Sequence, residues 1–135
     1  MKKEYILKSC FILGALFAAG GVILQAMATH LPADTLAQPR GREFLHSAAD
    51  ILLWHGIALC ALSPLQGYLN PMRQLIACCL MSIGTLLFSI PVILLGLNMI
   101  QHAVSAPFGG SLLILSWLIM ASAAFGKTNV FNKQK

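Results

Sequence analysis

Four long apolar stretches follow one another along the chain, at about residues 9–29, 44–66, 74–97 and 108–125. The first contains twenty consecutive uncharged residues from Ser9 to Ala28, which matches the length needed to cross a bilayer core. Backbone groups in hydrocarbon must be hydrogen-bonded within their own segment, so each stretch is predicted to be a helix. The pattern predicts an all-α fold, an integral membrane four-helix bundle forming a single domain over residues 1–135.

Two of the stretches depart from a simple transmembrane pattern. The first follows Lys2 and Lys3 and ends in Ala26-Met27-Ala28, which is typical of a cleaved secretory signal. It is longer than the apolar core of such signals, so a retained helix is expected. The second stretch begins amphipathically near Phe44 and is fully apolar only from residue 51 to 65.

Small and polar residues recur at helical spacing within the stretches. In the first they are spaced 4, 3, 4 and 3 residues apart, and they are Gly14, Ala18, Gly21, Gln25 and Ala28. Small residues let helix backbones approach in a membrane, where polar side chains add hydrogen bonds. This stripe is therefore expected to face another helix of the bundle.

The composition agrees with lipid as the solvent. Hydrophobic residues make up 58% of the chain and charged residues only 10%, whereas soluble domains carry about 25% charged residues. The net charge of +5 does not indicate nucleic-acid binding, because the basic residues lie at the edges of the apolar stretches and form no patch. We expect the bilayer to be the principal partner.

The distribution of basic residues predicts the orientation. An even number of spans places both termini and the loop between the second and third helices on one side. That side carries seven Lys and Arg residues against two, Arg40 and Arg42, on the other; the seven are Lys2, Lys3, Lys8, Arg73, Lys127, Lys133 and Lys135. Positive residues favour the cytoplasm. We therefore expect a multi-pass protein of the bacterial inner membrane with both termini cytoplasmic.

Ionisable side chains within the spans are the candidates for function, because they are costly in a membrane. His46 and Asp50 are four residues apart and should share a helix face. His55 lies about 140° around the helix from Asp50, so it should find its partner on another helix, among Gln25, His30 and Ser89. The candidate functional residues are Gln25, His30, His46, Asp50, His55, Ser89 and His102. Leu31 and Leu36, in the following loop, are expected to rest on the bilayer surface.

Cofactor binding and catalysis find less support. His30 and His55 could in principle ligate haem, and His30, His46 and His102 could bind zinc or copper. His30 lies near the membrane surface and His55 well inside, however, and the histidine spacing is not diagnostic of a metal site. No phosphate-binding loop or nucleophile motif is present. We therefore expect no cofactor, no metal site and no catalytic residues.

Four short motifs resemble a family of bacterial inner-membrane proteins, domain of unknown function 423, which is related to the transmembrane protein 256 group. They are AMATHLP at residues 26–32, LWHGIAL at residues 53–59, Phe88-Ser89, and PFGG at residues 107–110 followed by Ser116-Trp117. His30 and His55 fall on histidines of the family pattern. Glycines usual in the first motif are replaced by Gln25, Ala28 and Pro32, and Pro91 replaces a small residue. The resemblance implies the four-helix membrane fold and the inner-membrane location, and it points to no particular activity because the family is uncharacterised.

Three functions remain open. Short loops and small-residue faces favour an accessory or assembly protein that binds a membrane-protein partner or a second copy of itself. Asp50 and His55 inside the membrane would suit a small channel or proton-linked transporter. A haem or metal protein using His30 and His55 is the third. Substrate, partner and oligomeric state cannot be deduced from the sequence.

Overall fold

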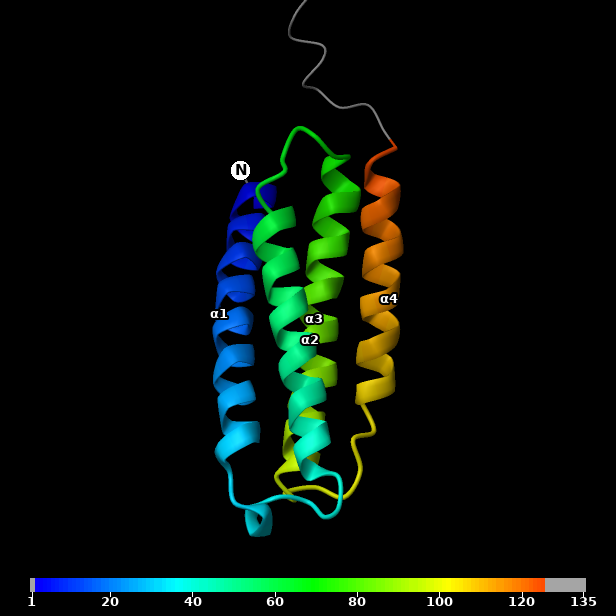
Figure 1. Ribbon diagram of the computed structural model, residues 1–135. Coiled ribbons are helices and arrows are strands. Elements are labelled where there is room, and N and C mark those ends of the chain that lie inside the picture. Colours follow the sequence, from blue (N-terminus) through cyan, green and yellow to red (C-terminus); the bar gives the residue numbers. More distant parts are fainter. Residues whose placement is uncertain (1, 126–135) are drawn as a thin grey trace, which may run out of the picture.

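The computed structural model describes residues 2–125, which form four helices joined by short connections (Figure 1). Helix α1 is Lys2–His30, α2 is Gly41–Leu62, α3 is Pro71–Gly96 and α4 is Ala106–Ala123. One turn of 3-10 helix, η1, spans Ala33–Thr35 in the α1–α2 connection. All four helices are long and apolar enough to cross a membrane. The predicted all-α, four-helix fold is confirmed.

The helix ends differ from the predicted ones where local chemistry extends or stops a helix. Helix α1 begins seven residues earlier than expected, at Lys2, and an ion pair between Glu4 and Lys8 supports the added turns. Helix α2 ends at Leu62, two residues before Pro64, because a proline has no backbone N–H to continue the helical hydrogen bonds. Helix α3 begins at Pro71 after Asn70, whose side chain accepts hydrogen bonds from two free backbone N–H groups.

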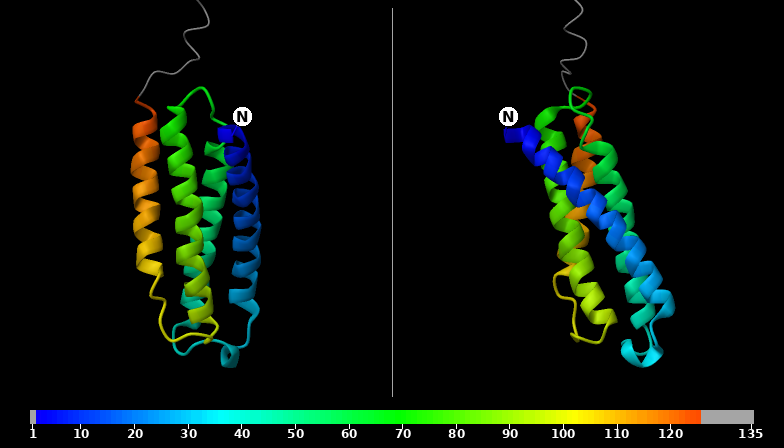
Figure 2. Two further views of the ribbon diagram at one scale, coloured as in Figure 1. Left: turned by 180° about the vertical axis from the view of Figure 1, so that it is seen from behind. Right: turned by 90° about the vertical axis from the view of Figure 1, so that its left-hand side faces the viewer.

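The helices form two antiparallel hairpins that lie side by side. Helices α2 and α3 lie in the middle, while α1 packs along α2 and α4 packs along α3 (Figure 1). Helix α1 crosses the others obliquely and touches α3 over a short stretch (Figure 2). Within residues 2–125, α3 is the only helix whose backbone closely approaches α4. The α1/α2 and α3/α4 hairpins are therefore the units of packing, and α2 against α3 joins them.

Glycines set the closest approaches within each hairpin. A Cβ added to Gly56 of α2 would lie 2.5 Å from the backbone nitrogen of Ala18. A Cβ added to Gly109 of α4 would lie 2.5 Å from the backbone nitrogen of Phe88. Gly14 and Gly21 of α1 also lie against the backbone of α2, so the small-residue stripe predicted for the first helix does face a neighbouring helix. No other residue fits at such separations, since a side chain would displace backbone.

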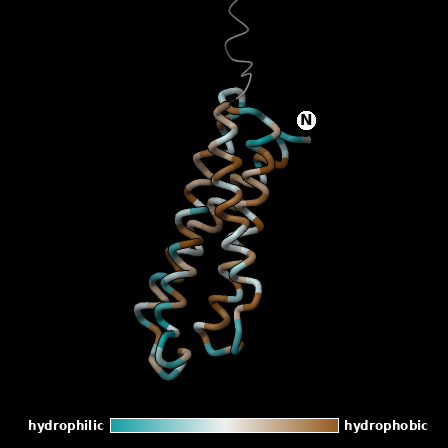
Figure 3. Tube along the Cα trace, turned by 90° about the vertical axis from the view of Figure 1, so that its right-hand side faces the viewer, coloured by the Kyte–Doolittle hydropathy of each residue, from teal (hydrophilic) through white to brown (hydrophobic). Residues whose placement is uncertain are grey.

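Both described chain ends lie at one end of the structure, together with the α2–α3 connection (Figure 1); we call this the terminal end. Hydrophilic residues gather at the terminal end and at the opposite end, and mainly hydrophobic residues lie between them (Figure 3). The exposed Tyr5 and Tyr68 both lie toward the terminal end, as is usual for tyrosines at a membrane surface. Lys127, Lys133, Lys135 and the side chain of Lys2, used in predicting the orientation, lie outside the described part of the chain.

The α1–α2 connection closes the opposite end of the structure. The backbone N–H of Ala37 donates to the carbonyl of Gly96, the last residue of α3, at 2.9 Å. Leu36 is buried in a core cluster with Leu24, Leu45 and Val92. The expectation that Leu36 rests on the bilayer surface is therefore wrong, because the loop folds inward over the end of α3.

Candidate functional site

A polar cluster of Gln25, His46 and Asp50 joins α1 to α2 inside the apolar spans. The Gln25 side-chain Nε2 donates to Asp50 Oδ1 at 2.7 Å, and His46 Nδ1 donates to Gln25 Oε1 at 2.5 Å. An amide oxygen only accepts hydrogen bonds, so His46 is the donor through Nδ1 in this contact. The predicted shared face of His46 and Asp50 is confirmed, with Gln25 bridging the two side chains.

The position of Asp50 sets this cluster apart from ordinary packing. Asp50 lies nine residues after the start of α2, which places it about 14 Å along the helix axis. It is nevertheless exposed, although Ala48 and Ala49 beside it are fully buried. The carboxylate therefore sits on the outward face of α2 and within an apolar span.

Asp50 belongs to a line of exposed residues on α2 that we call the outer stripe. Its members recur at alternating intervals of four and three residues, and they are Glu43, Ser47, Asp50, Trp54, Ile57 and Ala61. The half near the opposite end is polar, whereas the half beyond Asp50 is apolar. Residues at this spacing form one helix face that another helix could cover.

His55 is buried and has partners that the sequence did not predict. Its Nδ1 donates to the backbone carbonyl of Ile51 at 2.9 Å, and Trp117 Nε1 donates to its Nε2 at 3.3 Å. A carbonyl only accepts and an indole N–H only donates, so both contacts together require the neutral imidazole. The expected partners Gln25, His30 and Ser89 were wrong. Instead, His55 links α2 to α4, two helices whose backbones do not meet.

The remaining candidates are scattered. His30 ends α1 and His102 follows α3, and both are exposed near the opposite end. Ser89 of α3 is buried, and its hydroxyl has no hydrogen-bond partner among the described residues. None of these three side chains joins the polar cluster, so the structure gathers only part of the predicted set.

The geometry does not fit haem ligation by His30 and His55. Arg42 contacts the carbonyls on either side of His30, which places His30 level with the start of α2. His55 lies thirteen residues farther along α2, a separation of about 20 Å along the axis. In residues 2–125 no three His, Cys, Asp or Glu side chains lie close enough to hold a metal ion.

Sequence reasoning missed side chains that hold helix ends. Arg42 donates to the carbonyls of Ala28, Thr29 and Leu31 at the end of α1. Arg73 donates to the carbonyls of Ser122 and Phe125 at the end of α4. Gln74 is fully buried, and its Nε2 donates to the carbonyls of Leu62 and Ser63 at the end of α2. The two arginines had been interpreted only as signals of orientation.

These features define a multi-pass membrane protein of four apolar helices with a polar cluster inside one hairpin. Residues 24–110 match the model of a protein family described as "Protein of unknown function (DUF423)". Because the match covers more than half of the chain, the protein belongs to this family, and the predicted resemblance is confirmed. The matched region contains the whole polar cluster and His55 but ends before Trp117. Comparisons with curated proteins and with solved structures gave no match.

Proposed function

We propose that the protein is an accessory protein of the bacterial inner membrane, with both termini cytoplasmic, that binds a helix of another membrane protein. The outer stripe of α2 is the binding surface, and Asp50 is its central residue. The partner helix presents a hydrogen-bond donor at the depth of Asp50. The proposed activity is binding rather than catalysis.

The exposure of Asp50 is the observation that carries this proposal. An ionisable side chain facing lipid is unfavourable, although the cost here is smaller than at mid-membrane, because Asp50 is bonded to Gln25, three residues before Ala28 ends the uncharged run of α1. Gln25 occupies Oδ1 of the carboxylate, and the described residues offer Oδ2 no partner. A polar side chain of a partner helix would replace the missing contact and remove the carboxylate from lipid.

The neighbouring residues suit the same role. Trp54 lies one turn beyond Asp50 on the outer stripe and is 66% exposed. An exposed tryptophan beside a polar residue is the composition expected of a binding hot spot. Gln25 and His46 hold the Asp50 carboxylate in one orientation, so the surface is ordered before a partner arrives.

The proposed orientation rests on charge. Lys3, Lys8 and Arg73 lie toward the terminal end. Arg40 and Arg42 lie toward the opposite end, where Arg40 pairs with Glu43 and Arg42 is bound to backbone carbonyls. Basic residues near the span ends favour the cytoplasm whatever their partners, and Lys2, Lys127, Lys133 and Lys135 flank the first and last spans in the sequence, so the excess of Lys and Arg favours a cytoplasmic terminal end.

Photo-crosslinking in native membranes tests the binding surface. A benzoylphenylalanine replacing Trp54 should give a discrete product with another membrane protein, and Asp50→Leu should abolish that product. The matched control is the same probe at Ile114 of α4, which is 65% exposed and lies away from α2. Absence of a Trp54 product, or a Trp54 product unchanged by Asp50→Leu, would contradict the proposal.

A proton-linked transporter is the second candidate, because two titratable groups, His46 and Asp50, are joined through Gln25. The described residues extend this hydrogen-bonded chain no farther toward the terminal end. His55 is buried with both ring nitrogens engaged, so it is poorly placed to carry protons onward. Proteoliposomes that acidify at a rate dependent on Asp50, with Asp50→Asn inactive, would favour transport over partner binding.

A further inference from the structure

An open cavity of about 270 Å³ lies at the terminal end, away from the polar cluster. Its walls come from the first turns of α1 and from the segment that follows α2. Helix α1 contributes Glu4, Leu7, Lys8 and Phe11, and the segment after α2 contributes Pro64 and Gln66. The volume is slightly below the 300 Å³ at which pockets for drug-sized ligands begin, which suits a small polar group with a short apolar extension.

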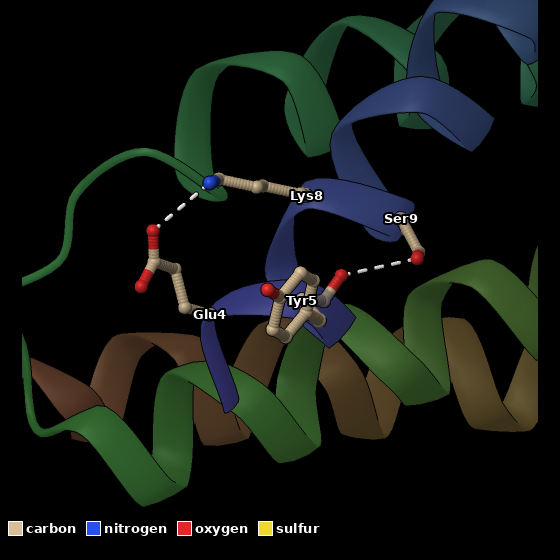
Figure 4. A network of polar contacts seen from close by, with 4 residues as sticks. All are labelled: Glu4, Tyr5, Lys8 and Ser9. Carbon is tan, nitrogen blue, oxygen red and sulfur yellow. Dashed lines mark hydrogen bonds and ion pairs between the residues drawn. The ribbon is translucent and has the colours of Figure 1, made fainter. Parts of the chain in front are cut away.

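The cavity has a polar edge and an apolar wall. Glu4 and Lys8 form an ion pair of 2.9 Å, and each side chain is more than half exposed. Their side chains extend together on one side of α1, whereas the Ser9 hydroxyl turns to the Tyr5 carbonyl (Figure 4). Leu7, Phe11 and Pro64 supply the apolar wall. The cavity thus offers one positive charge, one negative charge and a hydrocarbon surface.

The depth of the cavity matches that of lipid headgroups. Lys8 immediately precedes the twenty uncharged residues that begin at Ser9, so it marks the edge of the hydrocarbon region. Helix α1 has 29 residues and is about 43 Å long, which exceeds a hydrocarbon core of about 30 Å. Its first turns therefore project into the headgroup layer, where Tyr5 is also exposed.

We infer that this cavity binds a glycerophospholipid whose headgroup carries a primary amine, such as phosphatidylethanolamine. The lipid phosphate binds Lys8, its ammonium group binds Glu4, and the start of an acyl chain lies along Leu7 and Phe11. An exposed ion pair contributes little stability. Glu4 and Lys8 can therefore break their ion pair and bind the lipid headgroup instead, at a small cost in free energy. A lipid of net negative charge satisfies Lys8 but leaves Glu4 beside its phosphate without a cation.

The headgroup chemistry distinguishes three common phospholipids. Phosphatidylethanolamine supplies both the phosphate and N–H donors for the carboxylate. Phosphatidylcholine has a quaternary ammonium without N–H donors, and phosphatidylglycerol has no cation. Charge-assisted hydrogen bonds are the strong ones, so the amine lipid should bind about tenfold more tightly than the other two.

Native mass spectrometry of the full-length, delipidated protein in detergent tests the inference. Each lipid is titrated separately, and phosphatidylethanolamine should saturate one site at about tenfold lower concentration than phosphatidylglycerol or phosphatidylcholine. Lys8→Gln should weaken phosphatidylethanolamine about tenfold, whereas Lys8→Arg should retain it. Lys3→Gln is the matched control, because it removes the same charge nearby from a residue that does not line the cavity. Circular dichroism identifies any variant that has lost its helices.

A second variant tests the role of the carboxylate. Glu4→Gln removes the acceptor for the ammonium group and the repulsion toward anionic lipids, so the preference should shift to phosphatidylglycerol. Soluble O-phosphoethanolamine, which lacks acyl chains, should compete only weakly if the apolar wall contributes. Equal binding of all three lipids, equal effects of Lys8→Gln and Lys3→Gln, or full competition by O-phosphoethanolamine would overturn the assignment. None of these measurements involves the outer stripe of α2.

Discussion

The α1/α2 and α3/α4 hairpins have the same kinds of helix contact, but they differ in the polar side chains between their helices. Gly56 lets α2 approach α1, and Gly109 lets α4 approach α3. In each hairpin an arginine near the start of one helix, Arg42 or Arg73, hydrogen-bonds carbonyls at the end of its neighbour. Close packing and capped helix ends are thus common to both hairpins.

Among the described residues, only the α1/α2 hairpin carries a hydrogen-bonded cluster of side chains between its helices. In the α3/α4 hairpin, the buried hydroxyls of Ser82, Thr85 and Ser116 each bond to a carbonyl three or four residues earlier in the same helix. Within residues 2–125, the α3/α4 hairpin therefore packs without hydrogen bonds between side chains of its two helices. The comparison indicates that packing does not require Gln25, His46 and Asp50, which supports assigning them to function.

The largest loss of stability is expected at the close helix contacts that the two hairpins have in common. Gly56→Ala and Gly109→Ala each place a Cβ about 2.5 Å from neighbouring backbone, so each should lower the free energy of unfolding by about 1–3 kcal/mol. Gly20→Ala is the control in α1, since no atom of another element lies within 4 Å, and Gly110→Ala is the control in α4. Both controls should match or slightly exceed the native stability, because alanine favours helix.

Reversible unfolding in mixed detergent micelles measures all four glycine variants. Equal losses for Gly56→Ala and Gly109→Ala would establish that the hairpins depend on close packing to a similar degree. A loss confined to one hairpin would show that the two contacts are not equivalent.

The sequence predicted the fold well because the membrane imposes a strong and local constraint. Twenty apolar residues must form a helix in lipid whatever they contact, so the uncharged run from Ser9 was sufficient for α1. Helix ends were less predictable, since they depend on local groups such as Asn70 before α3 and the Glu4–Lys8 pair in α1.

The sequence predicted those features of the candidate site that depend on the spacing of residues within a single helix. His46 and Asp50 share a face by spacing alone, and that expectation held. Which residue of α1 lies opposite them depends on how far the helices slide past each other, and Gly14, Gly21 and Gly56 determine that offset together. The His55–Trp117 contact joins residues 62 positions apart, a separation at which helical periodicity carries no information.

A smaller effect is expected at the hydrogen bond between the side chains of His55 in α2 and Trp117 in α4. Trp117→Phe removes the indole donor and leaves Nε2 of the buried His55 without a partner, which should cost about 1–2 kcal/mol. His55→Leu removes the acceptor, and the double variant should cost less than the sum of the two single variants by about 1 kcal/mol. Additive single effects would show that the two side chains contribute independently.

The smallest change in stability is expected at Asp50, and it tells most about how the two hairpins differ. Asp50→Leu removes the Gln25–Asp50 hydrogen bond, worth about 1 kcal/mol, but it also removes an ionisable group from an apolar span, which is favourable. The two changes oppose each other, so the free energy of unfolding of the isolated protein should change by less than about 1 kcal/mol. Glu43→Leu, at the start of the same outer stripe, is the matched control and should also be nearly neutral.

The same unfolding assay in detergent distinguishes the two possible roles of Asp50. If Asp50→Leu lowered the stability by more than about 2 kcal/mol, the polar cluster would be a folding element of the α1/α2 hairpin. The analogy with the α3/α4 hairpin would then fail. A near-neutral result would leave an intramembrane carboxylate that folding does not need, placed on the exposed face of α2 beside Trp54. Such a result would agree with the proposed role of Asp50, in which a donor on a partner helix binds the carboxylate and removes it from lipid.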